Sequence, residues 1–122
     1  MTVRFEREYE TGAADLWSAL TEPDRLARWF AEVSGDLRPG GRVSITFDDG
    51  TEAMEIVTCE PPTTLVVRWL HAAYPASEVT ATVHPRGDAA LLVLEHRGLP
   101  GEKEPAYEEG WAEHLDLLAK DL

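Results

Sequence analysis

The chain of 122 residues has one cysteine, few basic residues and no long apolar run. Because Cys59 is alone, an intramolecular disulfide and a CxxC-type metal or redox site are excluded, and the cytosol is the expected compartment. The longest unbroken apolar run, Ala89 to Leu94, is too short to span a bilayer, and Arg4 and Glu6 interrupt any apolar core of a secretory signal. We therefore expect a soluble cytoplasmic protein without a membrane span.

Basic residues are outnumbered by acidic ones, 11 to 23, which gives a formal net charge of −12. Such a field repels nucleic acid and anionic lipid surfaces, and the scattered Lys and Arg residues form no cluster that could follow a phosphate backbone. A nucleic-acid partner is therefore not expected. The length fits one domain, residues 1–122, and the hydrophobic share of 43% indicates a folded core rather than disorder.

Several motifs of enzymes and metal proteins are also missing. Pro39-Gly40-Gly41 is followed by neither a helix nor a lysine, so it is no phosphate loop, and no GxSxG nucleophile elbow occurs. No second ligand is spaced to pair with His114 on a metal, and Cys59 has no basic neighbour that would activate its thiol. We expect no metal, no cofactor and no catalytic residue from motifs of this kind.

Two short amphipathic helices are predicted between residues 13 and 30. In the first, apolar side chains recur at the spacing of one helix face, at Ala13, Leu16, Trp17 and Leu20. The hydroxyl of Thr21 is expected to cap the second helix, with Pro23 in its first turn. The expected buried face of this second helix consists of Leu26, Trp29 and Phe30.

The rest of the chain alternates between apolar and polar residues, which predicts strands over residues 3–9, 43–47, 51–60, 65–70, 79–83 and 89–96. Turns are predicted at residues 39–41, 61–62 and 85–88, and Asp48-Asp49-Gly50 is typical of a hairpin loop. From Ala106 onward, apolar residues return at helical spacing. Short connections favour one curved antiparallel sheet, covered by a long C-terminal helix.

Several segments in this order carry a resemblance to a known family. They are Leu16-Trp17-Ser18-Ala19-Leu20-Thr21 with Trp29, Pro39-Gly40-Gly41, Pro61-Pro62 before Leu65 and Trp69, Leu92-Val93-Leu94-Glu95-His96 before Gly98-Leu99-Pro100, and Gly110-Trp111 before Leu115, Leu118 and Leu122. The chain resembles the START-like helix-grip superfamily (SRPBCC) over essentially its whole length. More narrowly, it is similar to the bacterial proteins grouped with the activator of heat-shock-protein-90 ATPase homologues.

The resemblance implies an α+β helix-grip fold. A curved antiparallel sheet of six to seven strands would wrap a long C-terminal helix, with two short helices after the first strand and a cavity between sheet and helix. Members of the superfamily bind lipids, polyketides and other hydrophobic small molecules there, and a minority are cyclases, aromatases or hydrolases. The sequence has no counterpart of the additional N-terminal domain that makes much of the chaperone contact in the eukaryotic co-chaperone, so a chaperone partner is not expected.

The candidate ligand-binding residues face the expected cavity. They are Met54, Ile56, Leu65, Val67, Trp69, Leu92, Leu94, His96, Tyr107, Trp111 and Leu115. His96 is either a buried, hydrogen-bonded structural residue or an acid, base or anchor for a ligand. Trp17 and Trp29 are expected to fill the core, whereas Trp69 and Trp111 could equally line a pocket.

Three hypotheses about function follow. The first is a non-enzymatic protein that binds a hydrophobic small molecule of lipid, polyketide or aromatic type, which enters between the C-terminal helix and the loops around residues 71–77. The second is a cyclase-like or hydrolase-like enzyme, which needs His96 to converge with a carboxylate or tyrosine. The third is a protein-interaction module that acts on a chaperone or another partner through its acidic surface, which needs a filled core and an exposed apolar patch. Neither the ligand nor the oligomeric state follows from the sequence.

Overall fold

The computed structural model describes residues 2–47, 50–71 and 74–122. In these ranges the order of elements follows the predicted order, and none of the helices is long and apolar enough to cross a bilayer. The elements are β1 (Thr2–Tyr9), α1 (Ala13–Thr21), α2 (Pro23–Trp29), β2 (Glu32–Gly35), β3 (Arg42–Phe47), β4 (Gly50–Glu60), β5 (Thr64–Leu70), β6 (Ser77–Arg86), β7 (Ala89–Arg97), the 3-10 turn η1 (Gly101–Lys103) and α3 (Glu104–Asp121).

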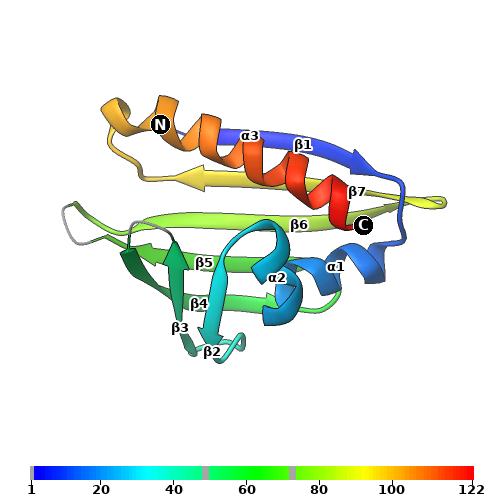
Figure 1. Cartoon of the computed structure of the whole chain (residues 1–122), viewed down its shortest axis with the longest axis horizontal. Helices are drawn as coiled ribbons and strands as arrows, with labels where there is room; N and C mark the ends of the chain where they lie inside the picture. Colours follow the sequence, from blue (N-terminus) through cyan, green and yellow to red (C-terminus); the bar gives the residue numbers. More distant parts are fainter. Residues whose placement is uncertain (1, 48–49, 72–73) are drawn as a thin grey trace.

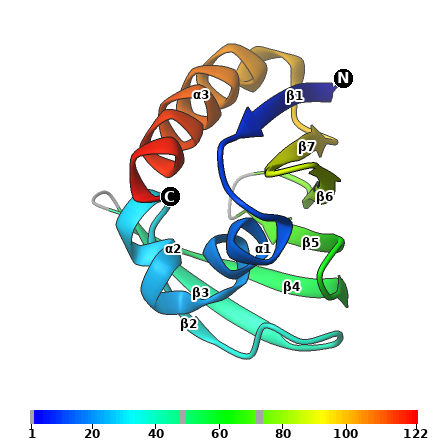
Figure 2. The same cartoon turned by 90° about the vertical axis from the view of Figure 1, so that its right-hand side faces the viewer.

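The strands form one seven-stranded antiparallel sheet in the order β1-β7-β6-β5-β4-β3-β2. The sheet curves around an interior that α3 covers on one side, and α1 and α2 close one end (Figures 1 and 2). This arrangement confirms the predicted helix-grip fold and the two short helices after the first strand.

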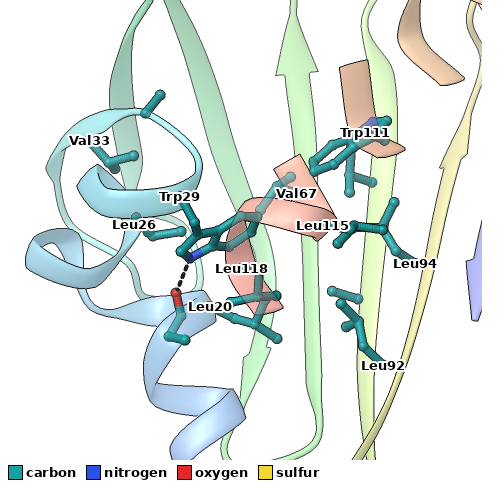
Figure 3. Packing of buried hydrophobic residues seen from close by; sticks show 14 of the residues in the cluster. Leu20, Leu26, Trp29, Val33, Val67, Leu92, Leu94, Trp111, Leu115 and Leu118 are labelled. Atoms are coloured by element: carbon teal, nitrogen blue, oxygen red, sulfur yellow. Dashed lines mark hydrogen bonds between the residues drawn. The ribbon is translucent and has the colours of Figure 1, made fainter. Parts of the chain in front are cut away.

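Period-2 alternation places one set of side chains on the concave face. Met54 of β4 lies opposite Trp69 of β5, and Ala81 of β6 lies opposite Leu94 of β7, and all four are buried. Leu115 and Leu118 of α3 are fully buried against this face (Figure 3). The core therefore lies between the concave face and the long helix.

The end closed by α1 and α2 is held by two tryptophans, as predicted. Trp17 and Trp29 are buried, and the indole Nε1 of Trp29 donates to the carbonyl of Ala19 over 2.9 Å (Figure 3). A buried indole N–H needs such a partner, because an unpaired one costs about 1–3 kcal/mol. This bond fixes α2 against α1.

The C-terminal half of α3 is fastened to two other elements. The hydroxyl of Tyr9, at the end of β1, donates to the carbonyl of Leu115 over 3.0 Å. The Asp121 carboxylate lies 3.8 Å from the guanidinium of Arg25 and 3.6 Å from that of Arg28, both in α2. These contacts hold this half of the helix over the closed end of the sheet.

Four local predictions need correction. Thr21 does not cap α2: it is the last residue of α1, and its hydroxyl donates to the carbonyl of Trp17 over 2.9 Å, while Glu22 occupies the cap position. The short strand β2 was not assigned a range of its own, because four residues give too little alternation. The predicted turn at 85–88 is shorter, since β6 continues through Pro85, which lies near a strand end where a missing N–H is tolerated.

The fourth correction concerns α3, which begins at Glu104 rather than Ala106, because Pro105 is compatible with a first helical turn. The predicted hairpin residues Asp48 and Asp49 lie outside the described residues, although β3 and β4 pair as far as Phe47 and Gly50.

Candidate functional site

Two neighbouring spaces lie between the sheet and α3 and share part of their lining. The inner space has a volume of about 60 Å³ and is lined by Leu20, Leu26, Trp29, Phe30, Val33, Leu37, Met54, Leu65, Val67, Trp69, Val79, Ala81, Leu94 and Trp111. The outer groove has a volume of about 240 Å³ and is lined by Phe30, Phe47, Glu52, Trp69, Ala106, Tyr107, Gly110, Trp111 and His114. The inner space has room for about four water-sized groups, so a larger ligand has to occupy the groove as well.

Three aromatic rings separate the inner space from the outer groove. The rings of Phe30 and Trp111 stack at 5.6 Å between centroids, and Trp69 meets each of them edge to face at 6.1 Å. The two indole N–H groups are tied to the polar partners described below, whereas Phe30 has no polar group. Phe30 is therefore the ring that can move without breaking a hydrogen bond.

The groove exists partly because α3 carries a glycine where it passes over it. A Cβ atom placed on Gly110 would have no atom within 4 Å, so it would project into open space. Glycine in a helix interior costs about 0.5–1 kcal/mol relative to alanine. Gly110 therefore lowers the stability of α3 and at the same time leaves space in the groove.

A chain of hydrogen bonds crosses the core beside these spaces. The indole Nε1 of Trp111 donates to Nδ1 of His96 over 3.0 Å. Nε2 of His96 lies 2.7 Å from the hydroxyl of Ser77, which lies 2.7 Å from Nε2 of His71. The chain joins α3, β7, β6 and the residue after β5.

The direction of each bond follows from chemistry. An indole N–H can only donate, so Nδ1 of His96 must accept, and the single proton of the neutral ring is on Nε2. That proton goes to Ser77, whose own hydroxyl proton then goes to His71. A second proton on His96 would face the indole N–H of Trp111, so the chain favours neutral imidazoles.

Burial acts in the same direction. His96 is fully buried, which lowers its pKa to about 4, with a smaller contribution from His71. Burial also lowers the pKa of His71, against an opposing effect of Glu52. Both ring nitrogens of His96 are occupied by Trp111 and Ser77, so neither is left to bind or protonate a ligand. A cyclase-like or hydrolase-like enzyme would need His96 to bond to a carboxylate or a tyrosine. Its ring nitrogens bond to Ser77 and Trp111 instead.

A carboxylate lies on the concave face where the alternation leads one to expect an apolar side chain. Glu52 precedes Met54 by two residues on β4 and pairs with the fully buried Ile45 of β3. One of its oxygens accepts a hydrogen bond from the indole Nε1 of Trp69. Glu52 therefore contributes a negative charge to a groove with aromatic walls.

The groove is bordered by further polar groups that already form hydrogen bonds within the protein. The hydroxyls of Tyr74 and Tyr107 lie 2.7 Å apart, which joins the segment before β6 to α3. Nδ1 of His114 lies 3.1 Å from the carbonyl of Trp29, and because a carbonyl only accepts, Nδ1 carries a proton and donates it to this oxygen. His114 is thus paired with the backbone, and no group of three metal-ligating side chains occurs in the described part of the chain.

The structure divides the candidate residues into three groups. Those that line the inner space are Met54, Leu65, Val67, Trp69, Leu94 and Trp111. Tyr107 lines the outer groove together with Trp69 and Trp111. The remaining four are buried but line neither space: Ile56, Leu92, His96 and Leu115.

Four polar groups of this region were missed in the sequence: Glu52, His71, Tyr74 and Ser77. Two of them leave a signal, because Glu52 continues the face of Met54, and Ser77 continues the face of Val79. His71 and Tyr74 follow β5 in a connection, where alternation gives no information. Their positions follow only from the folded chain.

Comparison with known proteins gives relatives of the same fold. The crystal structure of CalU16 from Micromonospora echinospora has a TM-score of 0.91 and 33% identity, covering 98% of this chain and 74% of that one. DynU16, described as a protein in the dynemicin biosynthetic locus, has a TM-score of 0.89 and 27% identity, with 98% of this chain and 46% of that chain covered. Protein MLL2253 from Mesorhizobium loti has a TM-score of 0.91 and 28% identity, covering 99% of this chain and 96% of that one.

A more distant structure, the Aha1 dimer from Colwellia psychrerythraea, shares the fold at 16% identity and a TM-score of 0.89. No match is found among curated proteins. The model of one protein family, described as Activator of Hsp90 ATPase homolog 1-like protein, matches residues 10–122. The chain therefore belongs to the Activator of Hsp90 ATPase homolog 1-like protein family.

Proposed function

We propose that the protein binds a hydrophobic small molecule of lipid, polyketide or aromatic type in the outer groove and the inner space behind it. The observation that carries this proposal is that the two spaces meet at Phe30, Trp69 and Trp111. A ligand that displaces the ring of Phe30 would reach from one space into the other. Apolar contact with these rings supplies most of the affinity, at about 25 cal/mol per Å² removed from water.

The predicted lining residues have different roles in this proposal. Those around the inner space contact the apolar part of the ligand, and Tyr107 contacts the part that stays in the groove. Ile56, Leu92, His96 and Leu115 support the lining from behind. DynU16 is described as belonging to a biosynthetic locus for dynemicin, which is compatible with a small-molecule ligand in this family.

The surface of the chain favours this proposal over a protein-interaction module. Among the residues that the structure describes, the exposed large hydrophobics are Val57 on β4 and Leu117 on α3, with 47% and 44% of their surfaces exposed. Single exposed apolar residues are ordinary, whereas a docking face needs a contiguous patch.

The experiment is a fluorescence titration with the neutral probe N-phenyl-1-naphthylamine. Its emission is expected to rise on binding to the native protein. Gly110→Leu places a side chain in the groove from a position where no other atom is near. It should weaken binding about tenfold or more, because the leucine side chain takes the space in which the ligand would contact the aromatic rings.

Glu109→Leu is the matched control, since it adds the same side chain at a neighbouring, exposed position of α3 that does not line the groove. Its affinity should stay within about twofold of the native value. Thermal unfolding followed by circular dichroism checks that both variants are folded. An absence of binding to the native protein, or equal binding by Gly110→Leu, contradicts the proposal.

A further inference from the structure

Among the described residues that line the outer groove, Glu52 is the acidic one. Glu52 lies on the concave face of β4, where its neighbours at two and four residues along, Met54 and Ile56, are buried. Glu52 itself is half-buried, and a carboxylate on such a face usually has a partner, because even partial removal of its charge from water is costly. The partner of the Glu52 carboxylate therefore indicates what kind of ligand the groove binds.

Within the described residues, Glu52 has one side-chain hydrogen bond and no ion pair. The bond comes from Nε1 of Trp69 and uses one carboxylate oxygen. Neither space is lined by lysine or arginine. Arg42 pairs in register with Glu55 and borders a third space of about 680 Å³ together with Glu52, but no ion pair joins Arg42 to Glu52 in the described part of the chain. The second oxygen of Glu52 has no hydrogen-bond partner among the described residues, so it is free to accept from a ligand.

The histidine near Glu52 does not neutralise it. The hydrogen-bond chain requires Nε2 of His71 to accept from Ser77, which is the neutral form of the ring. Burial lowers the pKa of His71 despite the presence of Glu52. His71 therefore supplies no positive charge beside Glu52.

The walls of the groove suit a cation as well. Glu52 is accompanied by five aromatic residues in the lining: Phe30, Phe47, Trp69, Tyr107 and Trp111. The faces of such rings attract ammonium groups, by about 0.5–2 kcal/mol per contact. The formal charge of −12 adds a field that concentrates cations at the surface.

We propose that the ligand carries a protonated amine, which binds the carboxylate of Glu52, and an aromatic or alkyl body, which lies against Phe30, Trp69 and Trp111. This inference rests on the proposed function and specifies its ligand class. The same charge disfavours an anionic ligand of the same shape. The amine forms a charge-assisted hydrogen bond to the free oxygen of Glu52, and the indole of Trp69 holds the carboxylate in place.

Three naphthalene compounds of similar size test the inference. They are 2-naphthylmethylamine, which is a cation at pH 7, 2-naphthylmethanol, which is neutral, and 2-naphthoate, which is an anion. Calorimetric titration of the native protein should give the amine an affinity about tenfold higher than the alcohol, and the anion the lowest. The preference for the amine should shrink with added salt.

Glu52→Gln keeps an amide oxygen for Trp69 but removes the charge. It should weaken amine binding about tenfold and leave alcohol binding within about twofold. Glu55→Gln is the control, because it removes the same charge from the opposite face of the same strand and should leave both affinities unchanged.

The outcomes separate the two proposals. If the alcohol and N-phenyl-1-naphthylamine bind but the amine is not preferred, or if Glu52→Gln weakens the amine and the alcohol equally, the inference is overturned and the proposed function stands. If none of the three naphthalene compounds binds and N-phenyl-1-naphthylamine does not bind either, the inference and the proposed function are both overturned. Should Glu52→Gln fail to fold, the order of the three compounds and its salt dependence on the native protein decide the matter.

Discussion

The indole Nε1 of Trp111 donates to Nδ1 of His96 over 3.0 Å, and this bond joins α3 to β7 in the middle of the core. It also determines where the proton of the imidazole is, because an indole N–H leaves Nδ1 no role except that of acceptor. The consequence is a histidine that resists protonation through both geometry and burial.

The free energy of unfolding should therefore fall in acid because of His96. Its pKa is lowered from 6.5 to about 4 in the folded protein, so the unfolded chain binds the proton more tightly. This contribution is present above about pH 6.5 and is lost as the pH falls towards 4, and it amounts to about 3 kcal/mol. Urea unfolding at a series of pH values measures it.

His96→Gln is the matched variant for this measurement. The glutamine amide can accept from Trp111 and donate to Ser77 but does not titrate. The difference in stability between native protein and variant should change across pH 4 to 6.5, and equal slopes for the two proteins would exclude His96 as the origin.

Ser77→Ala should lower the free energy of unfolding by about 1–3 kcal/mol. The variant leaves the Nε2 proton of the fully buried His96 without an acceptor and removes the donor to His71. Ser44→Ala, on the exposed face of β3, is the control and should change stability by less than about 0.5 kcal/mol. Equal effects of the two substitutions in chemical denaturation would show that the hydrogen bonds of Ser77 contribute nothing to the free energy of unfolding.

Phe30→Ala should speed the binding of N-phenyl-1-naphthylamine. Phe30 separates the inner space from the outer groove without a polar anchor, so its removal opens the passage. Stopped-flow fluorescence is expected to show an association rate several-fold higher, within the range of about 1–3 decades that such variants span. Phe5→Ala, another half-buried phenylalanine that lines neither space, should leave the rate unchanged. An unchanged rate in Phe30→Ala would show that the ring is not on the path.

Two glycines should respond to alanine in opposite directions. Gly35 has a φ of +123°, and a Cβ there would lie 2.4 Å from the carbonyl oxygen of Arg42, so Gly35→Ala should cost about 1–3 kcal/mol or more. Gly110→Ala meets open space in a helix and should gain about 0.5–1 kcal/mol. Thermal and urea unfolding of both variants compare the signs directly. A stabilising Gly35→Ala would contradict the conformation described here.

The fold could be predicted from the sequence because most strands and helices carry their own pattern. Met54 and Ile56 alternate with outward residues, and Trp111 and Leu115 share one helix face. The strands and the covering helix can therefore be predicted from the pattern of neighbouring residues in each segment. β2 was not assigned, because its four residues are too few to show an alternation of their own.

The site was less predictable, because its chain of hydrogen bonds joins side chains from separate helices and strands. Trp69, His96 and Trp111 were expected on the concave side, and they do lie there. That His96 meets Ser77 follows from how β6 and β7 pair beside a connection, which periodicity does not describe. Glu52 was recognisable in principle as a charge within an apolar stripe.

The fastening of α3 makes its local stability unequal along its length. Beyond Trp111, the helix is tied to β1 and α2 through Leu115 and Asp121, whereas before it the described side-chain hydrogen bond is that of Tyr107 to Tyr74. Gly110 lies at the boundary between these halves. Amide hydrogens of residues 104–110 should therefore exchange faster than those of residues 111–121, and the helix opens from its N-terminus, at the groove, while the core beneath its other half stays closed.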